Sequence, residues 1–183
     1  MNSTNAIPRF LLVLLLALLL TACGGGASGS SDLPPTDLGD GSGDTVPVDD
    51  DPLPGDTREE EVLILVNQVR AEYDLAPVQW HEGAAAVALA HSKDMRDRDF
   101  FDHVNPDGLD AGDRLTAAGV EFSGWGENIA RGYLTPESVM EGWMNSPGHR
   151  ANILSEHWTH LGIGVTAPVT PGPWWTQNFL RVP

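Results

Sequence analysis

Apolar and polar positions divide the chain into three stretches of different character. Residues 10–20 form an unbroken apolar run, residues 24–56 are rich in Gly, Ser, Asp and Pro, and apolar residues recur periodically in the remainder. The first run is shorter than the roughly 20 residues that a membrane-spanning helix requires. It follows the basic Arg9 and precedes two small residues, which is the pattern of a secretory signal peptide over residues 1–22.

The periodic positions from residue 57 onward predict two long helices. The first is expected to begin near Thr57 and to end before Pro77. Its apolar face comprises Val62, Leu65, Val66, Val69 and Tyr73. The second is expected from Glu82 to about Arg98. One stripe of it carries Ala84, Ala88, His91 and Met95. We interpret His91 as a core histidine because it lies on this stripe.

Start and stop signals predict three shorter helices in the second half of the chain. One spans residues 110–118 and is ended by Gly119, and another spans 136–145 with a proline in its first turn. Ser146-Pro147 repeats the same start signal and predicts a third helix.

Extended segments are expected mainly near the end of the chain. Residues 161–165 and 174–179 predict two strands that are joined by a turn rich in Pro and Gly. Further extended segments are expected near Gln79 and Ile129. Helices that come first and a hairpin that comes last indicate the α+β class.

Cys23 is the only cysteine in the chain, and it directly follows Leu20-Thr21-Ala22. These four residues resemble the lipobox of bacterial lipoproteins, in which the cysteine is acylated and becomes the first residue of the mature chain. Lipidation of Cys23 would hold the protein on a membrane outside the cytoplasm. The resemblance also implies the outer membrane if the cell has two, because Gly24 and not Asp follows the cysteine.

The distribution of charge separates a tether from a domain. The whole chain carries a formal net charge of −16, and residues 24–56 contain eight Asp and no Lys or Arg. We expect residues 23–56 to form a disordered acidic tether, because they cannot bury enough apolar surface to offset the entropy of ordering. Residues 57–183 are expected to form one domain and to be monomeric. An acidic chain without a basic stripe is not expected to bind nucleic acid.

Few residues of the domain are suited to catalysis by a nucleophile. The only thiol is expected in the lipid anchor, and no Gly-x-Ser-x-Gly motif is present.

His149 falls in the first turn of its helix if Ser146 is the N-cap. The positive end of the helix dipole would then keep the ring neutral and able to ligate a metal. Arg114, which follows Asp113 on a short helix, is interpreted as part of a structural ion pair.

Polar motifs concentrate in a few segments. They span residues 100–108 (FFDHVNPDG), 124–130 (GWGENIA), 143–154 (WMNSPGHRANIL) and 175–179 (WTQNF). Taken in this order, the motifs resemble those of the CAP superfamily, also called the SCP-like extracellular domain, in its bacterial branch. The resemblance covers nearly all of residues 57–183. It implies an α-β-α sandwich, with helices on both faces of a small antiparallel sheet.

The resemblance also implies a central cavity that is lined by two histidines and one or two glutamates. Matched motif by motif, His103 and His149 take the histidine positions, and Glu127 takes the glutamate position. Many members carry a second glutamate three residues after the tryptophan of the third motif, where this chain has Ser146. Asn128 and Gln177 are expected to support the cavity rim by hydrogen bonding to the backbone.

Two interpretations of these cavity groups stay open. Two histidines and a glutamate with one open position can hold a divalent metal such as zinc. Equally, the three groups can bond one another and a water and simply tie loops together.

Two functions follow from the resemblance. The favoured one is a non-catalytic binding module on the cell envelope, with a lipid, glycan or protein ligand. The alternative is a metal-dependent hydrolase in which Glu127 is the catalytic base.

Overall fold

The structure, a computed structural model, describes residues 58–168 and 172–183. The predicted signal peptide, Cys23 and the predicted tether lie outside the described residues, as does Thr57. These assignments and the domain boundary at residue 57 therefore stay predictions. No helix within the described ranges combines the length and the apolar character that crossing a bilayer would require.

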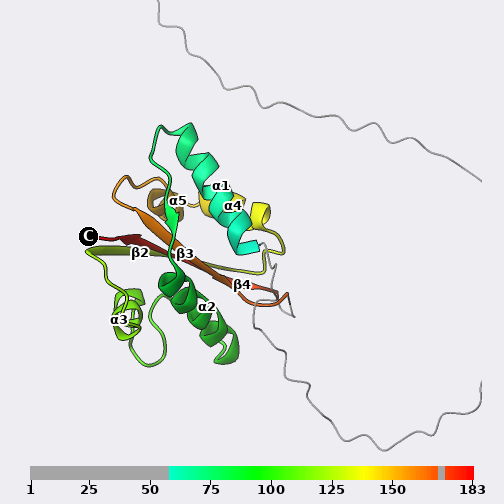
Figure 1. Ribbon diagram of the computed structural model, residues 1–183. Coiled ribbons are helices and arrows are strands. Elements are labelled where there is room, and N and C mark those ends of the chain that lie inside the picture. Colours follow the sequence, from blue (N-terminus) through cyan, green and yellow to red (C-terminus); the bar gives the residue numbers. More distant parts are fainter. Residues whose placement is uncertain (1–57, 169–171) are drawn as a thin grey trace, which may run out of the picture. The chain divides into compact units, whose positions relative to one another are not determined.

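A four-stranded sheet forms the centre of the domain (Figure 1). Its strands are β1 (Gln79–Trp80), β2 (Gly124–Arg131), β3 (His160–Val165) and β4 (Trp174–Arg181). They lie in the order β1-β3-β4-β2, so β2 is an edge strand. β4 pairs antiparallel with both of its neighbours.

The sheet is mixed, whereas the family resemblance implied an antiparallel one. The short strand β1 pairs parallel with β3. A parallel neighbour needs a long crossover connection. The chain supplies this crossover, because four helices and β2 lie between β1 and β3 in the sequence.

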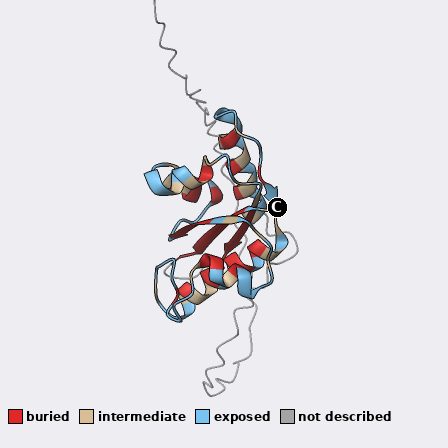
Figure 2. Cartoon of the chain, turned by 90° about the vertical axis from the view of Figure 1, so that its left-hand side faces the viewer, coloured by how far each residue is buried: buried red, intermediate tan, exposed pale blue. Residues whose placement is uncertain are grey.

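Helices cover both faces of the sheet. They are α1 (Arg58–Glu72), α2 (Glu82–Asp97), α3 (Ala111–Ala117), α4 (Pro136–Met144) and α5 (Pro147–Ile153). α2 packs on β3 and β4, with α3 beside it, while α1, α4 and α5 lie over the opposite face. In Figure 2 the buried sides of the helices turn toward a buried sheet. The expected α-β-α sandwich is confirmed.

Successive residues of β3 point to opposite faces of the sheet, and the two sets pack against different helices. Leu161, Ile163 and Val165 of β3 pack with α1 and α4 in the largest core cluster. Between them, Gly162 and Gly164 face α2, and a Cβ at either position would collide with the backbone of that helix. The absence of side chains at these two positions therefore allows α2 to lie directly on the sheet.

The predicted helices and strands occur where they were expected, within a few residues at most ends. On α2, the whole predicted stripe is buried, His91 included. On α1 the predicted face is wrong at one position, because the helix ends at Glu72 and Tyr73 is 46% exposed. The ring of Tyr73 lies beside Arg150, whose Nη2 donates to the Tyr73 hydroxyl at 2.6 Å.

Arg70 is the buried residue of α1 that the apolar pattern did not predict. Its side chain is fully buried, and its guanidinium donates to backbone carbonyls of Ala76, Ile153 and Ser155 at 2.8 Å each. Burial lowers the pKa of Arg70. The side chain joins the segment after α1 to the end of α5.

Candidate functional site

Glu127 and His103 are in direct contact at the edge of the sheet. Glu127 lies on β2 and its side chain is 1% exposed, whereas His103 lies in the loop between α2 and α3 and is half exposed. Nδ1 of His103 and Oε1 of Glu127 are 2.8 Å apart. Since a carboxylate only accepts, the His103 Nδ1 carries the proton of this hydrogen bond. The structure thus brings two of the three predicted cavity residues into contact.

Arg114 occupies the other oxygen of the same carboxylate. Its Nη2 donates to Glu127 Oε2 at 2.6 Å, and its Nη1 donates to the backbone carbonyls of His103 and Leu109 at 2.9 and 2.8 Å. The ion pair expected of Arg114 exists, but Asp113 is not the partner, because the Asp113 side chain forms the capping box of α3. One guanidinium therefore joins α3, the His103 loop and the edge strand.

His91 lies beside this pair although it is a core residue. Its Nε2 is 3.1 Å from the carbonyl oxygen of Asp102 and 4.0 Å from Glu127 Oε1. Because a carbonyl oxygen only accepts, Nε2 carries the proton. Nδ1 is buried and has no hydrogen-bond partner in the described part of the chain. The core interpretation of His91 is confirmed, and its proximity to Glu127 is a feature that helical spacing did not indicate.

The two histidines near Glu127 respond to it in opposite ways. The hydrogen bond to Glu127 is the main reason why the pKa of His103 is raised above its ordinary value. Burial lowers the pKa of His91, and this effect outweighs the attraction of the Glu127 charge. The half-exposed His103 ring therefore becomes cationic more readily than a free histidine, while the buried His91 ring becomes cationic less readily.

His149 reaches the edge of the sheet from the opposite face, on α5. Ser146 is the N-cap of α5 and Pro147 its first residue, so His149 lies in the first turn as predicted. The pKa of His149 is lowered, in the expected direction, but the causes are burial first and the charge of His103 second. The ring makes no hydrogen bond to the Glu127–His103 pair within the described residues.

A pocket of about 330 Å³ lies next to His149 along the edge strand. Its lining combines aromatic, cationic and small side chains from β2, α4, α5 and three connecting segments: Phe101, Ile129, Ala130, Arg131, Tyr133, Gly142, Trp143, Ser146 and His149. The Arg131 guanidinium lies over the rings of Phe101 and Trp174, at 5.6 and 5.2 Å from their centroids. We call this feature the edge pocket. Its aromatic and cationic lining suits a flat polar ligand.

An amide network joins β2 to α5 and β4 beside the edge pocket. Asn128 Nδ2 donates to the His149 carbonyl at 3.2 Å and to Gln177 Oε1 at 3.0 Å. Asn152, which sequence analysis did not single out, donates from its Nδ2 to Asn128 Oδ1 at 2.9 Å and to the Glu127 carbonyl at 3.1 Å. The backbone contact predicted for Asn128 is confirmed.

The predictions for Gln177 and Ser146 need correction in detail. Gln177 accepts from Asn128, its partner on the adjacent strand, and its Nε2 has no hydrogen-bond partner among the described residues. Ser146 lines the edge pocket but makes no side-chain capping bond to α5.

The groups around Glu127 do not fit a divalent cation as they are placed. Both carboxylate oxygens accept short hydrogen bonds, one from a guanidinium that would repel a metal ion. The His103 nitrogen nearest to Glu127 carries a proton and cannot ligate. Among the described residues, no group of three or more His, Asp or Glu could hold a metal ion. The arrangement instead corresponds to the hydrogen-bonded interpretation of these residues.

Comparison with protein families matches residues 63–179 to CAP, the cysteine-rich secretory protein family. The chain belongs to the CAP family. Cysteine-rich does not describe this member, since the matched residues contain no cysteine. The family that was expected from the sequence is therefore confirmed.

Two relatives come from Bacillus subtilis. The chain is 39% identical over 125 residues to "Uncharacterized membrane protein YlbC", covering 68% of this chain and 35% of that protein. It is 42% identical over 122 residues to "Uncharacterized protein YkwD", covering 67% of this chain and 46% of that protein. This chain thus matches less than half the length of either relative.

Solved structures agree with the fold. An extracellular protein containing a SCP domain from Bacillus anthracis has 39% sequence identity and a TM-score of 0.62, over 68% of this chain and 40% of that chain. An outer surface protein from Borrelia burgdorferi has the same TM-score of 0.62 with 19% identity, over 70% of this chain and 96% of that chain. The second likeness supports the fold alone.

Proposed function

We propose that this protein presents its CAP domain on the outside of the cell as a non-catalytic binding module. The edge pocket is the proposed ligand site, and an envelope glycan is the proposed ligand class. Lipid on Cys23 is proposed to hold the protein at the membrane, with residues 24–56 as the spacer.

The observation that carries the proposal is the double engagement of Glu127. A general base must be reached by the water or substrate group whose proton it removes. Both oxygens of Glu127 are held, at 2.8 Å by His103 and at 2.6 Å by Arg114, and the side chain is almost fully buried. This arrangement supports a structural role for Glu127, in which it links β2 to α3 and the His103 loop, over the role of catalytic base in a hydrolase.

The composition of the edge pocket supports a sugar over an acyl chain. Phe101 and Tyr133 are 47% and 38% exposed, so aromatic surface is available for contact with the face of a sugar ring. Arg131 and His149 add polar groups beside them. A pocket of about 330 Å³ is at the lower end of the range for small-ligand sites, and a mixed lining fits a polar ligand.

Relatives and sequence support the proposed location. One relative is described as a membrane protein and one solved relative as an extracellular protein. The apolar run at residues 10–20 and Cys23 after it are consistent with export and lipidation.

Co-sedimentation of the full chain in detergent with isolated cell-wall polysaccharide tests the proposal. Tyr133→Ala removes an aromatic wall of the edge pocket, and Leu134→Ala is the matched control, because Leu134 is adjacent and more exposed but does not line the pocket. We expect Tyr133→Ala to weaken binding about 5- to 30-fold, as for a ligand-contacting aromatic residue, and Leu134→Ala to leave it nearly unchanged.

Three results would overturn the proposal. The first is failure of the wild-type chain to sediment with the polysaccharide. The second is an equal effect of the two substitutions. The third is release of soluble fragments by the wild type that stops in Glu127→Gln, which would support the hydrolase instead.

A further inference from the structure

The edge of β3 that faces β1 is only partly covered. β3 spans six residues, but β1 has two, and they pair only with His160 and Leu161. The remaining residues of β3, from Gly162 to Val165, have β4 on one side and no strand on the other. The free part of this edge is therefore four residues long.

The direction of the backbone groups along this edge follows from the bonds that β1 makes. Gln79 and His81 donate their N–H groups to the carbonyls of Thr159 and Leu161, at 2.9 and 3.0 Å. Backbone groups alternate in direction along a strand. Ile163 and Val165 therefore direct their N–H and C=O groups to the same edge, beyond the end of β1.

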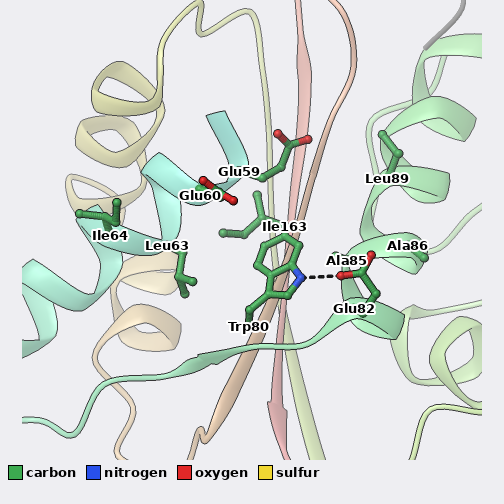
Figure 3. A pocket seen from close by; sticks show the side chains of 10 residues that line it. All are labelled: Glu59, Glu60, Leu63, Ile64, Trp80, Glu82, Ala85, Ala86, Leu89 and Ile163. Carbon is green, nitrogen blue, oxygen red and sulfur yellow. Dashed lines mark hydrogen bonds between the residues drawn. The ribbon is translucent and has the colours of Figure 1, made fainter. Parts of the chain in front are cut away.

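A groove of about 760 Å³ lies along this free edge, between α1 and α2. Figure 3 shows Leu63 and Ile64 of α1 on one side, Leu89 of α2 on the other, and Ile163 of β3 between them. Trp80 of β1 lies in the middle of this view. Ile163 is only 2% exposed, so a ligand that reaches its backbone must enter the groove. We call this feature the β3 groove.

The rim of the β3 groove is acidic. Glu59 and Glu60 from α1 and Glu82 from α2 line it, and the described residues that line it include no Lys or Arg. Glu82 also accepts a hydrogen bond from the Trp80 indole at 2.8 Å. Apolar walls below a negative rim complement a ligand with apolar and cationic groups in alternation.

We propose that the β3 groove binds an extended, basic peptide segment of a partner protein, which adds a strand to β3 in continuation of β1. The peptide backbone bonds Ile163, the residue of β3 that lines the groove. Its apolar side chains enter between Leu63 and Leu89, and its Lys or Arg side chains meet the glutamate rim. Strand addition of this kind derives affinity from the backbone and specificity from alternate side chains.

The charge of this chain argues against its own segments as occupants. Residues 24–56 precede α1 and contain eight Asp and no Lys or Arg, so the glutamate rim would repel them. A second copy of the chain carries the same net charge of −16 and would be repelled in the same way. A basic partner segment is the occupant that the charges favour.

Fluorescence anisotropy of a labelled peptide of alternating Lys and Val, titrated with the full chain in detergent at low salt, tests the proposal. Glu60→Lys reverses a rim charge. Glu61→Lys is the matched control, because it makes the same change in the first turn of α1 but does not line the groove. We expect about tenfold weaker binding for Glu60→Lys and less than about twofold for Glu61→Lys.

A second pair of probes tests the strand addition itself. A peptide of the same sequence, methylated on alternate backbone nitrogens, keeps its charges but loses donors, and we expect at least about fivefold weaker binding. A peptide of alternating Glu and Val should not bind.

Equal binding of the methylated peptide, an equal effect of both charge reversals, or no binding to the wild type would overturn the proposal. Absence of peptide binding together with self-association of Glu60→Lys would mean that the glutamates only protect a sheet edge from pairing.

Discussion

Arg114 and Glu127 form an ion pair in which both side chains are withdrawn from solvent. Their side chains are 10% and 1% exposed, and Nη2 and Oε2 are 2.6 Å apart. Arg114 also holds the backbone of the His103 loop. The pair therefore fixes the position of His103 and of the edge strand at the same time.

Loss of Arg114 should be far more damaging than loss of an exposed ion pair. Arg114→Ala leaves a buried carboxylate without its cation, which costs about 3–5 kcal/mol of unfolding free energy. Arg98→Ala, which breaks the exposed pairs with Asp94 and Asp107, should cost less than about 1 kcal/mol. Urea denaturation of both variants measures the difference. Similar midpoints would contradict a structural role for the Arg114–Glu127 pair.

The close approach of α2 to the sheet predicts strong intolerance at Gly164. A Cβ there would collide with the backbone of Leu89, so Gly164→Ala should destabilise the domain by about 3 kcal/mol. Gly148→Ala on α5 is the control, because its Cβ meets nothing within 4 Å. That substitution should be neutral or stabilise by up to about 1 kcal/mol. Thermal unfolding compares the two, and equal melting temperatures would contradict the described packing.

His91 and His103 should shape the acid response of stability in opposite ways. The pKa of His91 is lowered in the fold, so below about pH 6.5 the unfolded chain binds a proton that the native chain resists, and stability falls. The pKa of His103 is raised, so its contribution is full below about pH 6.5 and is lost as pH rises through the folded value.

Denaturation at about pH 5 and about pH 8 should separate these effects. His91→Gln should lose less stability than the wild type on acidification, and His103→Gln should lose more. Identical pH dependence in all three proteins would mean that neither ring titrates as described.

Cys23→Ser should release the protein from membranes and leave the domain folded. The anchor is separated from the first described residue, Arg58, by the whole of residues 24–57. Cell fractionation with acyl labelling measures the change, and the melting temperature of the released protein is the control. A variant that stays in the membrane fraction, or a wild type that takes up no label, would contradict the lipoprotein proposal.

Local signals explain how much of the fold could be predicted. The proline and capping residues placed α3, α4 and α5 correctly, since a helix start depends on a few neighbouring residues. The parallel pairing of β1 could not be predicted in this way, because pairing partners are far apart in sequence. The proximity of His103 and Glu127 was predicted from the family motifs and not from the spacing of residues along the chain.

The burial of Arg70 and the ion-pair partner of Arg114 were missed, and both involve charged groups in the interior. Arg70 lies on the same helical stripe as Val62 and Val66, and that spacing was a usable signal of its burial. Arg114 is the only Lys or Arg between Arg98 and Arg131, which could have marked it as the partner of Glu127. The periodicity of apolar residues did not predict the burial of either arginine, because a charged residue usually marks a solvent-facing position.

Calorimetric titration of zinc into the full chain at neutral pH tests the role of Glu127 most directly. If His103 and Arg114 hold the carboxylate as a tie, no saturable zinc binding should depend on these residues, and His103→Ala and Glu127→Gln should titrate like the wild type. One zinc ion bound per chain, lost in both variants and weakened as pH falls through about 6.5, would contradict this role and reinstate the metal-dependent alternative.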